Sequence, residues 1–286
     1  MSFSRTISLT ALTMIAFAGN SLFCRMALKT TMIDAASFTL IRFISGGFVL
    51  WLVMRIKQGK PQTRGQTRGD WLSAVILFIY AAGFSFAYIK LSAGVGALLL
   101  FGAVQATMIL YGMWNGERFG RWQLTGLVLA LAGLTGLLLP GLSAPPLMGS
   151  LLMLGAGVAW GAYSLLGKGA TDPTAVTAGN FLRAIPVSAV LSIVMIRQLS
   201  LDGLGIVYAV LSGALTSGIG YAVWYSVLPF LKATQAATVQ LSVPVLAALA
   251  GILFLDEQLS LRLVLASVAI LGGIVLVIKQ RNSTAR

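Results

Sequence analysis

Two groups of aromatic residues are spaced so that the members of each group lie on one face of a helix. They are Tyr80, Phe84 and Tyr88, at intervals of four residues, and Tyr221, Trp224 and Tyr225. Residues three and four apart are neighbours on a helix surface. Aromatic rings stack on flat or apolar groups and hold cations over their faces. We expect both groups to line a binding cavity, with burial against lipid or other helices as the alternative.

Further side chains that can form hydrogen bonds lie inside apolar runs. They are Asn20, Trp160, Tyr163, Ser164 and Gln240. An amide in an apolar environment costs free energy unless it finds a partner. We expect Asn20 to hold the amino or carboxyl group of a ligand, with bonding between helices as the alternative. The other four residues are predicted to complete the same site.

Three more residues are unusual in apolar runs. Pro244 frees backbone carbonyls from their helical donors, so we expect a kink or hinge there. Arg42 and Arg183 occupy matching places in two such runs. A charge inside a membrane is by default a candidate for function. The matched placement instead favours a structural role, in which each guanidinium snorkels to a surface or bonds a free carbonyl.

The residue types that are missing exclude several kinds of chemistry. The chain has no histidine, and its one cysteine, Cys24, lies in an apolar run. We therefore expect no disulfide, no metal site and no cofactor. All seven acidic residues lie at or beyond the ends of apolar runs. An enzyme acting inside a membrane would need a nucleophile with a base, so this class is disfavoured.

The composition is that of a membrane protein. Hydrophobic residues make up 58% and charged residues 9% of the 286 positions, and the mean hydropathy is +0.92. A soluble domain carries about 25% charged residues. The chain cannot cover itself with a polar surface, and we expect an integral membrane protein.

Ten apolar runs are each about 20 residues long, the length that crosses a bilayer as a helix. They are residues 8–28, 36–56, 71–90, 94–114, 121–139, 147–168, 175–196, 204–228, 234–255 and 261–279. Barrel strands are about 10 residues long and alternate in polarity, which does not fit these runs. We predict an all-α fold with ten transmembrane helices. Residues 1–18 resemble a signal peptide, but the first run continues to Leu28, so we expect it to remain as the first helix.

Positive charges indicate which helix ends face the cytoplasm. The loop from Arg55 to Asp70 holds the densest cluster of lysine and arginine in the chain. Cytoplasmic loops collect these residues, so we expect this loop and both termini on the cytoplasmic side. The loop charges left on the other side are Lys29, Lys90, Arg197 and Arg262. This bias explains the net charge of +13 without a nucleic-acid partner.

The second half of the chain repeats the order of the first at an offset of about 140 residues, which aligns Glu117 with Glu257. We predict two five-helix repeats, residues 1–143 and 144–286, that form one transport domain. Because five is an odd number, the second repeat enters the membrane from the opposite side. Inverted repeats are typical of transporters, with the substrate site near the midplane between the repeats.

The last helix of each predicted repeat is rich in glycine, with Gly126, Gly133 and Gly136 in the first repeat. Small residues let helix backbones approach closely. These glycines serve either contact inside the chain or contact between two copies. We expect a monomer, with a dimer as the alternative.

Several of these features together resemble a known family. An acidic residue, Glu117 or Glu257, closes the fourth helix of each repeat, and Ser242 and Pro244 resemble a Ser-x-Pro element. With the five-plus-five plan, they resemble the EamA-type branch of the drug/metabolite transporter superfamily over nearly the whole chain. The aromatic residues are most similar to those of bacterial exporters of aromatic amino acids and paraquat-like dications. One departure is that Val104 stands where the first repeat would match Pro244.

The resemblance implies an exporter in the bacterial inner membrane that moves aromatic and other apolar amino acids by alternating access. An exporter of multiple drugs or other small metabolites, organic cations included, is the alternative, and an intramembrane enzyme is a distant one. The expected partners are a small-molecule substrate and the lipid bilayer. Since no carboxylate or histidine is predicted inside a span, we expect transport that is not strictly coupled to protons.

Overall fold

The computed structural model describes residues 2–57, 69–116, 120–139, 144–231, 236 and 239–281. Every regular element in these residues is a helix, which confirms the all-α prediction. Eight helical stretches in the described part are long and apolar enough to cross a membrane. Two shorter apolar helices coincide with the last two predicted spans. The fold is that of an integral membrane protein.

The main α-helices follow the predicted spans in order. They are α1 (Phe3–Thr30), α2 (Ala35–Lys57), α3 (Trp71–Tyr88), α4 (Ala93–Trp114), α5 (Arg121–Leu138), α6 (Leu147–Leu166), α7 (Pro173–Val194), α8 (Gly203–Val210), α9 (Gly220–Val227), α11 (Ser242–Leu255) and α12 (Leu261–Arg281).

Two of the predicted spans differ from the observed helices. The first helix begins at Phe3 rather than residue 8, because the Ser2 hydroxyl accepts a bond from the Arg5 amide and caps it. The eighth span is not a uniform α-helix. Its middle, Leu211–Ile219 (η2), is a π-helix, and its end, Leu228–Phe230, is a 3-10 turn.

Acidic residues at helix ends act as N-caps, which explains why they lie outside the apolar runs. In α2, α3, α7 and α8, a backbone N–H group of the first turn donates to the carboxylate of the preceding aspartate. These aspartates are Asp34, Asp70, Asp172 and Asp202 respectively. The first N–H groups of a helix have no intrahelical acceptor, and the helix dipole favours a negative charge there. Each carboxylate therefore fixes where a membrane helix begins.

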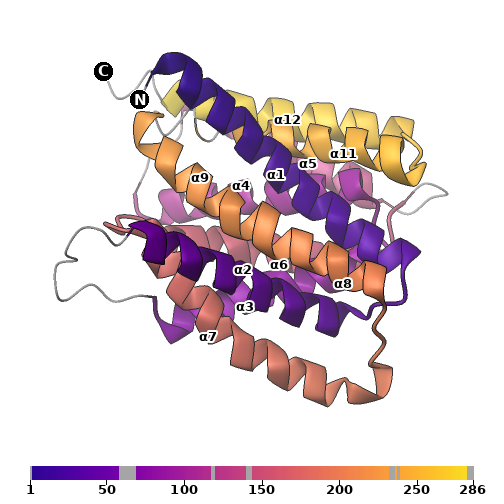
Figure 1. Cartoon of the computed structure of the whole chain (residues 1–286). Helices are drawn as coiled ribbons and strands as arrows, with labels where there is room; N and C mark the ends of the chain where they lie inside the picture. Colours follow the sequence, from indigo (N-terminus) through magenta and orange to yellow (C-terminus); the bar gives the residue numbers. More distant parts are fainter. Residues whose placement is uncertain are drawn as a thin grey trace.

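The helices form one bundle in which early and late segments of the chain alternate (Figure 1). α1 lies along the helix made of α8, η2 and α9, and also packs against α11. α2 packs against α7, α3 against α6 and α7, α4 against α6 and α11, and α5 against α12. α1 begins and α12 ends at the same end of the bundle (Figure 1).

The π-helix packs closely on α2. A Cβ atom on Gly213 would collide with the Arg42 carbonyl oxygen and the Ser45 hydroxyl. On the other side of η2, the Ser212 and Thr216 hydroxyls donate to Asn20 Oδ1 on α1, at 2.7 and 3.3 Å. The irregular segment is thus held between the first two helices of the chain.

Glycine also sets the contact between α5 and α12. A Cβ atom on Gly133 would lie 2.7 Å from the Ala269 Cβ, and one on Gly273 would meet the Gly126 carbonyl oxygen. A Cβ atom on Gly136 would meet nothing within 4 Å. Gly126 and Gly133 therefore serve contact inside the chain, one of the two uses predicted for this glycine-rich helix.

Candidate functional site

A small pocket of about 30 Å³, here called the cavity, lies between helices of the bundle. Side chains from α1, α3, α4, α6, η2 and α9 line it together with Gln240. The lining residues are Phe17, Asn20, Ser21, Tyr80, Phe84, Leu100, Phe101, Trp160, Thr216, Ser217, Tyr221 and Gln240. Both ends of the sequence contribute to one mostly aromatic and apolar chamber with a few polar groups, as is typical of small-molecule sites.

Aromatic rings from α3, α6 and α9 meet in the wall of this cavity. The Trp160 ring is stacked on Tyr221, with centroids 5.4 Å apart and planes 19° apart. Trp160 also contacts Tyr80 at 4.8 Å between centroids. Phe84 continues the wall, 5.6 Å from Tyr80. Six of the residues predicted for the site line the cavity: Asn20, Tyr80, Phe84, Trp160, Tyr221 and Gln240.

The other predicted site residues lie elsewhere. Trp224 packs against Phe17, 6.1 Å between centroids, behind the cavity wall. The Ser164 hydroxyl donates to the Trp160 carbonyl of its own helix. Tyr88, Tyr163 and Tyr225 belong to the two hydrogen-bonded clusters described below, one on each side of the cavity.

Asn20 makes the bonds between helices that were considered for it, and whether it also holds a ligand stays a prediction. Its side chain lines the cavity, and its Oδ1 accepts the Ser212 and Thr216 hydroxyls of η2. Gln240, which also lines the cavity, donates from Nε2 to the Ala236 carbonyl at 3.2 Å. Both amides are thereby held in place at the cavity surface.

Two buried polar atoms in the described residues have no hydrogen-bond partner: Arg42 Nη1 and Ser217 Oγ. Ser217 lines the cavity. Arg42 is 2% exposed, its Nη2 donates to the Tyr80 hydroxyl at 3.3 Å, and its guanidinium lies over the rings of Tyr80 and Phe84. Arg42 therefore neither snorkels to a surface nor bonds a free carbonyl in this way, contrary to the expectation. Arg183, in the matching place, does donate to a carbonyl, that of Gly179.

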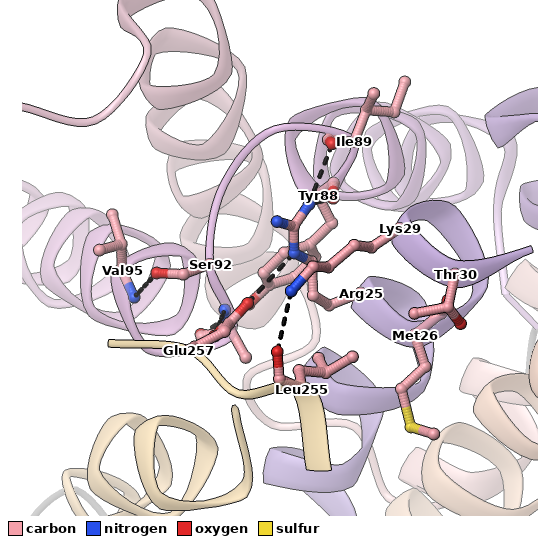
Figure 2. Close-up of polar contacts among 11 residues, drawn as sticks. Arg25, Met26, Lys29, Thr30, Tyr88, Ile89, Ser92, Val95, Leu255 and Glu257 are labelled. Carbon is pink, nitrogen blue, oxygen red and sulfur yellow. Dashed lines mark hydrogen bonds and ion pairs between the residues drawn. The ribbon is translucent and has the colours of Figure 1, made fainter. Parts of the chain in front are cut away.

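The end of the bundle that holds Arg25, Tyr88 and Glu257, here called the Glu257 end, is closed by a charged cluster (Figure 2). Arg25 Nε lies 3.2 Å from Glu257 Oε1. Arg25 Nη1 donates to the carbonyls of Tyr88 and Ile89 at 2.8 and 2.9 Å. This cluster ties α1 and α3 to the end of α11.

Two further contacts extend this cluster. Glu257 Oε2 accepts the Ala93 amide at 2.7 Å at the start of α4, and Lys29 Nζ donates to the Leu255 carbonyl at 2.9 Å. The Tyr88 ring meets Phe84 edge-on, 4.7 Å between centroids, so the cluster borders the cavity wall. Glu117, the predicted counterpart of Glu257, lies outside the described residues.

α3 begins after its cap Asp70 at the opposite end of the bundle, here called the Asp70 end, where a network of neutral side chains joins α6, α7 and α9. Asn180 Nδ2 donates to the Tyr163 hydroxyl at 3.1 Å, and the Thr177 hydroxyl donates to that of Tyr225 at 3.2 Å. Asn180 Oδ1 accepts the backbone N–H of Asp70 at 2.9 Å. Bonds from Ser73 lower the pKa of the Asp70 carboxyl, so it stays ionised and caps α3.

Pro244 lies in the first turn of α11, three residues after a turn at Leu241. A proline is tolerated in the first helical turn because the N–H that it lacks has no intrahelical acceptor there. The break thus precedes the proline rather than following it. Whether this point acts as a hinge stays a prediction.

Several residues of the site were not predicted from the sequence. Phe17 lies three residues before Asn20, on the same face of α1, and this helical spacing is the signal that would have found it. Asn180 and Ser217 carry no such signal, because their roles depend on contacts between helices. In the described residues no three His, Cys, Asp or Glu side chains are grouped so that they could hold a metal ion.

Comparison with known proteins identifies the family. Residues 147–279 match the model of the EamA-like transporter family. An uncharacterised protein of Pseudomonas aeruginosa is 58% identical over 281 residues, which cover 98% of this chain and 97% of that protein. An uncharacterised transporter of Archaeoglobus fulgidus is 24% identical over 290 residues, covering 96% of this chain and 97% of the relative.

Two more likenesses are informative. The threonine/homoserine exporter RhtA of Salmonella typhimurium is 36% identical over 154 residues, 51% of each chain. A solved crystal structure shares the fold with a TM-score of 0.66 at 22% identity, covering 93% of this chain and 96% of that one. With its ten apolar helical segments, the chain belongs to the EamA-like transporter family of the drug/metabolite transporter superfamily, and it is a membrane transporter, not an enzyme.

Proposed function

We propose that this transporter exports aromatic and other apolar amino acids across the bacterial inner membrane. The observation that carries the proposal is the stack of Trp160 on Tyr221 beside Tyr80 in the wall of the cavity. An apolar side chain or a flat ring fits against such faces. Two amides, Asn20 and Gln240, supply polar contacts for the backbone groups of an amino acid. The relative named as the threonine/homoserine exporter RhtA supports amino-acid export in general.

Alternating access is the proposed mechanism. The cavity lies between two clusters that close opposite ends of the bundle, one around Glu257 and one around Asn180. In the cycle, the Glu257 end opens while the Asp70 end stays closed, and the reverse follows. We propose that the Asp70 end faces the cytoplasm, with both termini, because the sequence of the loop after α2 is rich in lysine and arginine.

The helix contacts support the two inverted repeats that this mechanism needs. If residues 1–143 correspond to residues 144–286, a contact between α3 and α6 implies one between α1 and the helix of α8, η2 and α9. A contact between α4 and α6 likewise implies one between α1 and α11. All four contacts occur, and α2 with α7, α4 with α11 and α5 with α12 are pairs of corresponding helices. We propose that the halves rock about this relation.

The proposed function is tested by uptake of radiolabelled phenylalanine into liposomes that hold the purified protein. Saturable uptake is expected, and an imposed pH gradient should leave it unchanged, because the acids of the described residues lie at helix ends. Trp160→Ala should weaken the affinity for phenylalanine about two- to tenfold, the range of a stacked aromatic pair.

Trp51→Ala is the matched control for this variant. Trp51 lies on α2 and is 40% exposed. Within the described residues, the one aromatic ring that it stacks on is that of Phe48, which is also exposed. Loss of Trp51 should not alter the affinity. Absence of phenylalanine uptake by the wild type would refute amino-acid export, and a steep dependence on the pH gradient would refute uncoupled transport.

A second candidate, export of organic cations, is favoured by the same aromatic faces. Trp160, Tyr221 and Tyr80 would hold a cation over their rings. Uptake of methyl viologen in place of phenylalanine would establish this second function.

A further inference from the structure

We propose that Arg42 makes the cavity selective for substrates that carry a carboxylate, and that it excludes organic cations. The inference rests on the proposed transport function and deepens it, because it names the charge of the transported class. Arg42 is completely buried on α2 and lies against Tyr80 and Phe84, both of which line the cavity.

The charge of Arg42 has no ionic partner in the described part of the chain. The ion pair recorded there joins Arg25 to Glu257. Of the other described acids, Asp34, Asp70, Asp172 and Asp202 are used as helix caps, and Asp256 is exposed at the end of α11. An uncompensated buried charge is strongly unfavourable. The faces of Tyr80 and Phe84, 5.5 and 5.1 Å from the guanidinium carbon, offset part of this cost.

The hydrogen bonds of Arg42 leave capacity for an anion. Nη2 donates to the Tyr80 hydroxyl, while Nη1 has no partner. A guanidinium can bind a carboxylate through two N–H groups at once. The Tyr80 hydroxyl accepts the bond from Nη2 and keeps its own proton, which it can donate to a carboxylate in the cavity.

A second donor without a partner lies in the cavity wall. Ser217 is 1% exposed, lines the cavity from η2, and its hydroxyl has no partner. Tyr80 and Ser217 thus line the cavity, Arg42 lies directly against the lining residues Tyr80 and Phe84, and none of the lining residues carries a carboxylate. This combination attracts a negatively charged group and repels a positive one, since charges interact strongly away from water.

The test compares three ligands that share a phenyl ring and differ in charge. They are L-phenylalanine, a zwitterion; 3-phenylpropionate, an anion; and L-phenylalaninamide, a cation. Their binding to the purified full-length protein is measured by titration calorimetry. We expect the wild type to bind the first two and to bind phenylalaninamide at least about tenfold more weakly, as expected when a charge-assisted hydrogen bond is lost.

Variants then assign the preference to Arg42. Arg42→Gln should weaken phenylpropionate binding about 10- to 100-fold, while Arg42→Lys, which keeps the charge, should preserve the order of the three ligands. Arg183→Gln is the matched control: it removes an arginine at the corresponding place on α7, and the order of the ligands should not change. The wild-type comparison stands even where a variant fails to fold.

The outcomes separate this inference from the proposed function. Phenylalaninamide binding as tight as that of phenylpropionate would overturn carboxylate selectivity. Phenylalanine binding with the same preference in Arg42→Gln would overturn the role of Arg42 and leave amino-acid export intact. Arg42-dependent binding of phenylpropionate without phenylalanine would support the inference and refute amino-acid export. Binding of none of the three would overturn both.

Discussion

At the scale of single residues, Glu257 joins helices that are far apart in the sequence. One carboxylate oxygen contacts Arg25 on α1 and the other accepts the first amide of α4. The side chains of Arg25 and Glu257 are 11% and 9% exposed, so water weakens the pair little. Removing one partner of such a pair leaves the other charge buried, which makes it a sensitive point of the Glu257 end.

Glu257→Gln should open the Glu257 end more often. Cys24, next to Arg25 in α1, is fully buried, so its thiol reports opening of this region. Loss of a charged hydrogen bond of about 1.5 kcal/mol predicts about a tenfold faster reaction of Cys24 with a thiol reagent. Arg262→Gln is the control, because Arg262 lies at the same end but donates to the Leu139 carbonyl. An unchanged Cys24 rate would mean that other contacts keep this end closed.

The sequence predicted which residues share a helix face better than it predicted their contacts with other helices. The four-residue spacing of Tyr80 and Phe84 places both rings on one face of α3, and both line the cavity together with Tyr221 of α9. Whether these rings bind a substrate stays a prediction. Arg42 and Arg183 looked equivalent, yet one is enclosed by rings and the other bonds a carbonyl. That difference depends on neighbouring helices, which spacing along one helix does not contain.

At the scale of elements, the π-helix of residues 211–219 is the largest departure from the prediction. Hydropathy identifies the apolar run but is insensitive to the extra residue per turn. The wider turn is fixed by contacts, with Gly213 against α2 on one side and Asn20 against Ser212 on the other. Such segments are frequently found at functional sites, and this one supplies Thr216 and Ser217 to the cavity.

Gly213→Ala should separate η2 from α2. The added methyl group would meet the Arg42 carbonyl oxygen, a backbone atom that cannot turn away. Overpacking of this kind costs about 1–3 kcal/mol, so the midpoint of thermal unfolding should fall. Gly203→Ala is the control, because a Cβ atom there meets nothing within 4 Å. Equal midpoints for the two variants would show that the contact is not tight.

At the scale of the whole molecule, composition and the length of the apolar runs were sufficient to predict an integral membrane protein with an all-α fold. A chain with 9% charged residues and ten apolar runs of helical length can satisfy its backbone hydrogen bonds in lipid as helices and in few other ways. Which helices touch could not be predicted in the same way, because lipid-facing and helix-facing sides of these apolar segments are chemically alike. The contact of α5 with α12 became visible only in the structure.

Gly133→Ala and Gly136→Ala form a matched pair that tests this contact. The two glycines lie in the same helix, but only a Cβ atom on Gly133 would press on Ala269. We expect Gly133→Ala to lower the stability by about 1–3 kcal/mol. Gly136→Ala should be neutral or stabilising by up to about 1 kcal/mol, since alanine favours the helix. If instead Gly136→Ala changed the oligomeric state in size-exclusion chromatography, part of the glycine face would serve a dimer.

The position of the π-helix has a mechanical consequence. Tyr221 and Tyr225 both follow it in the same helix, one in the cavity and one in the cluster of the Asp70 end. If one wide turn were rewound as an α-turn, everything beyond it would rotate by about 100° and shift by about 1.5 Å, the increments of one residue. The Tyr221 ring, which stacks on Trp160, and the Tyr225 hydroxyl, which bonds Thr177, would move together as one rigid body. A change in helical winding at this one place would therefore alter the cavity wall and the cluster at the Asp70 end at the same time.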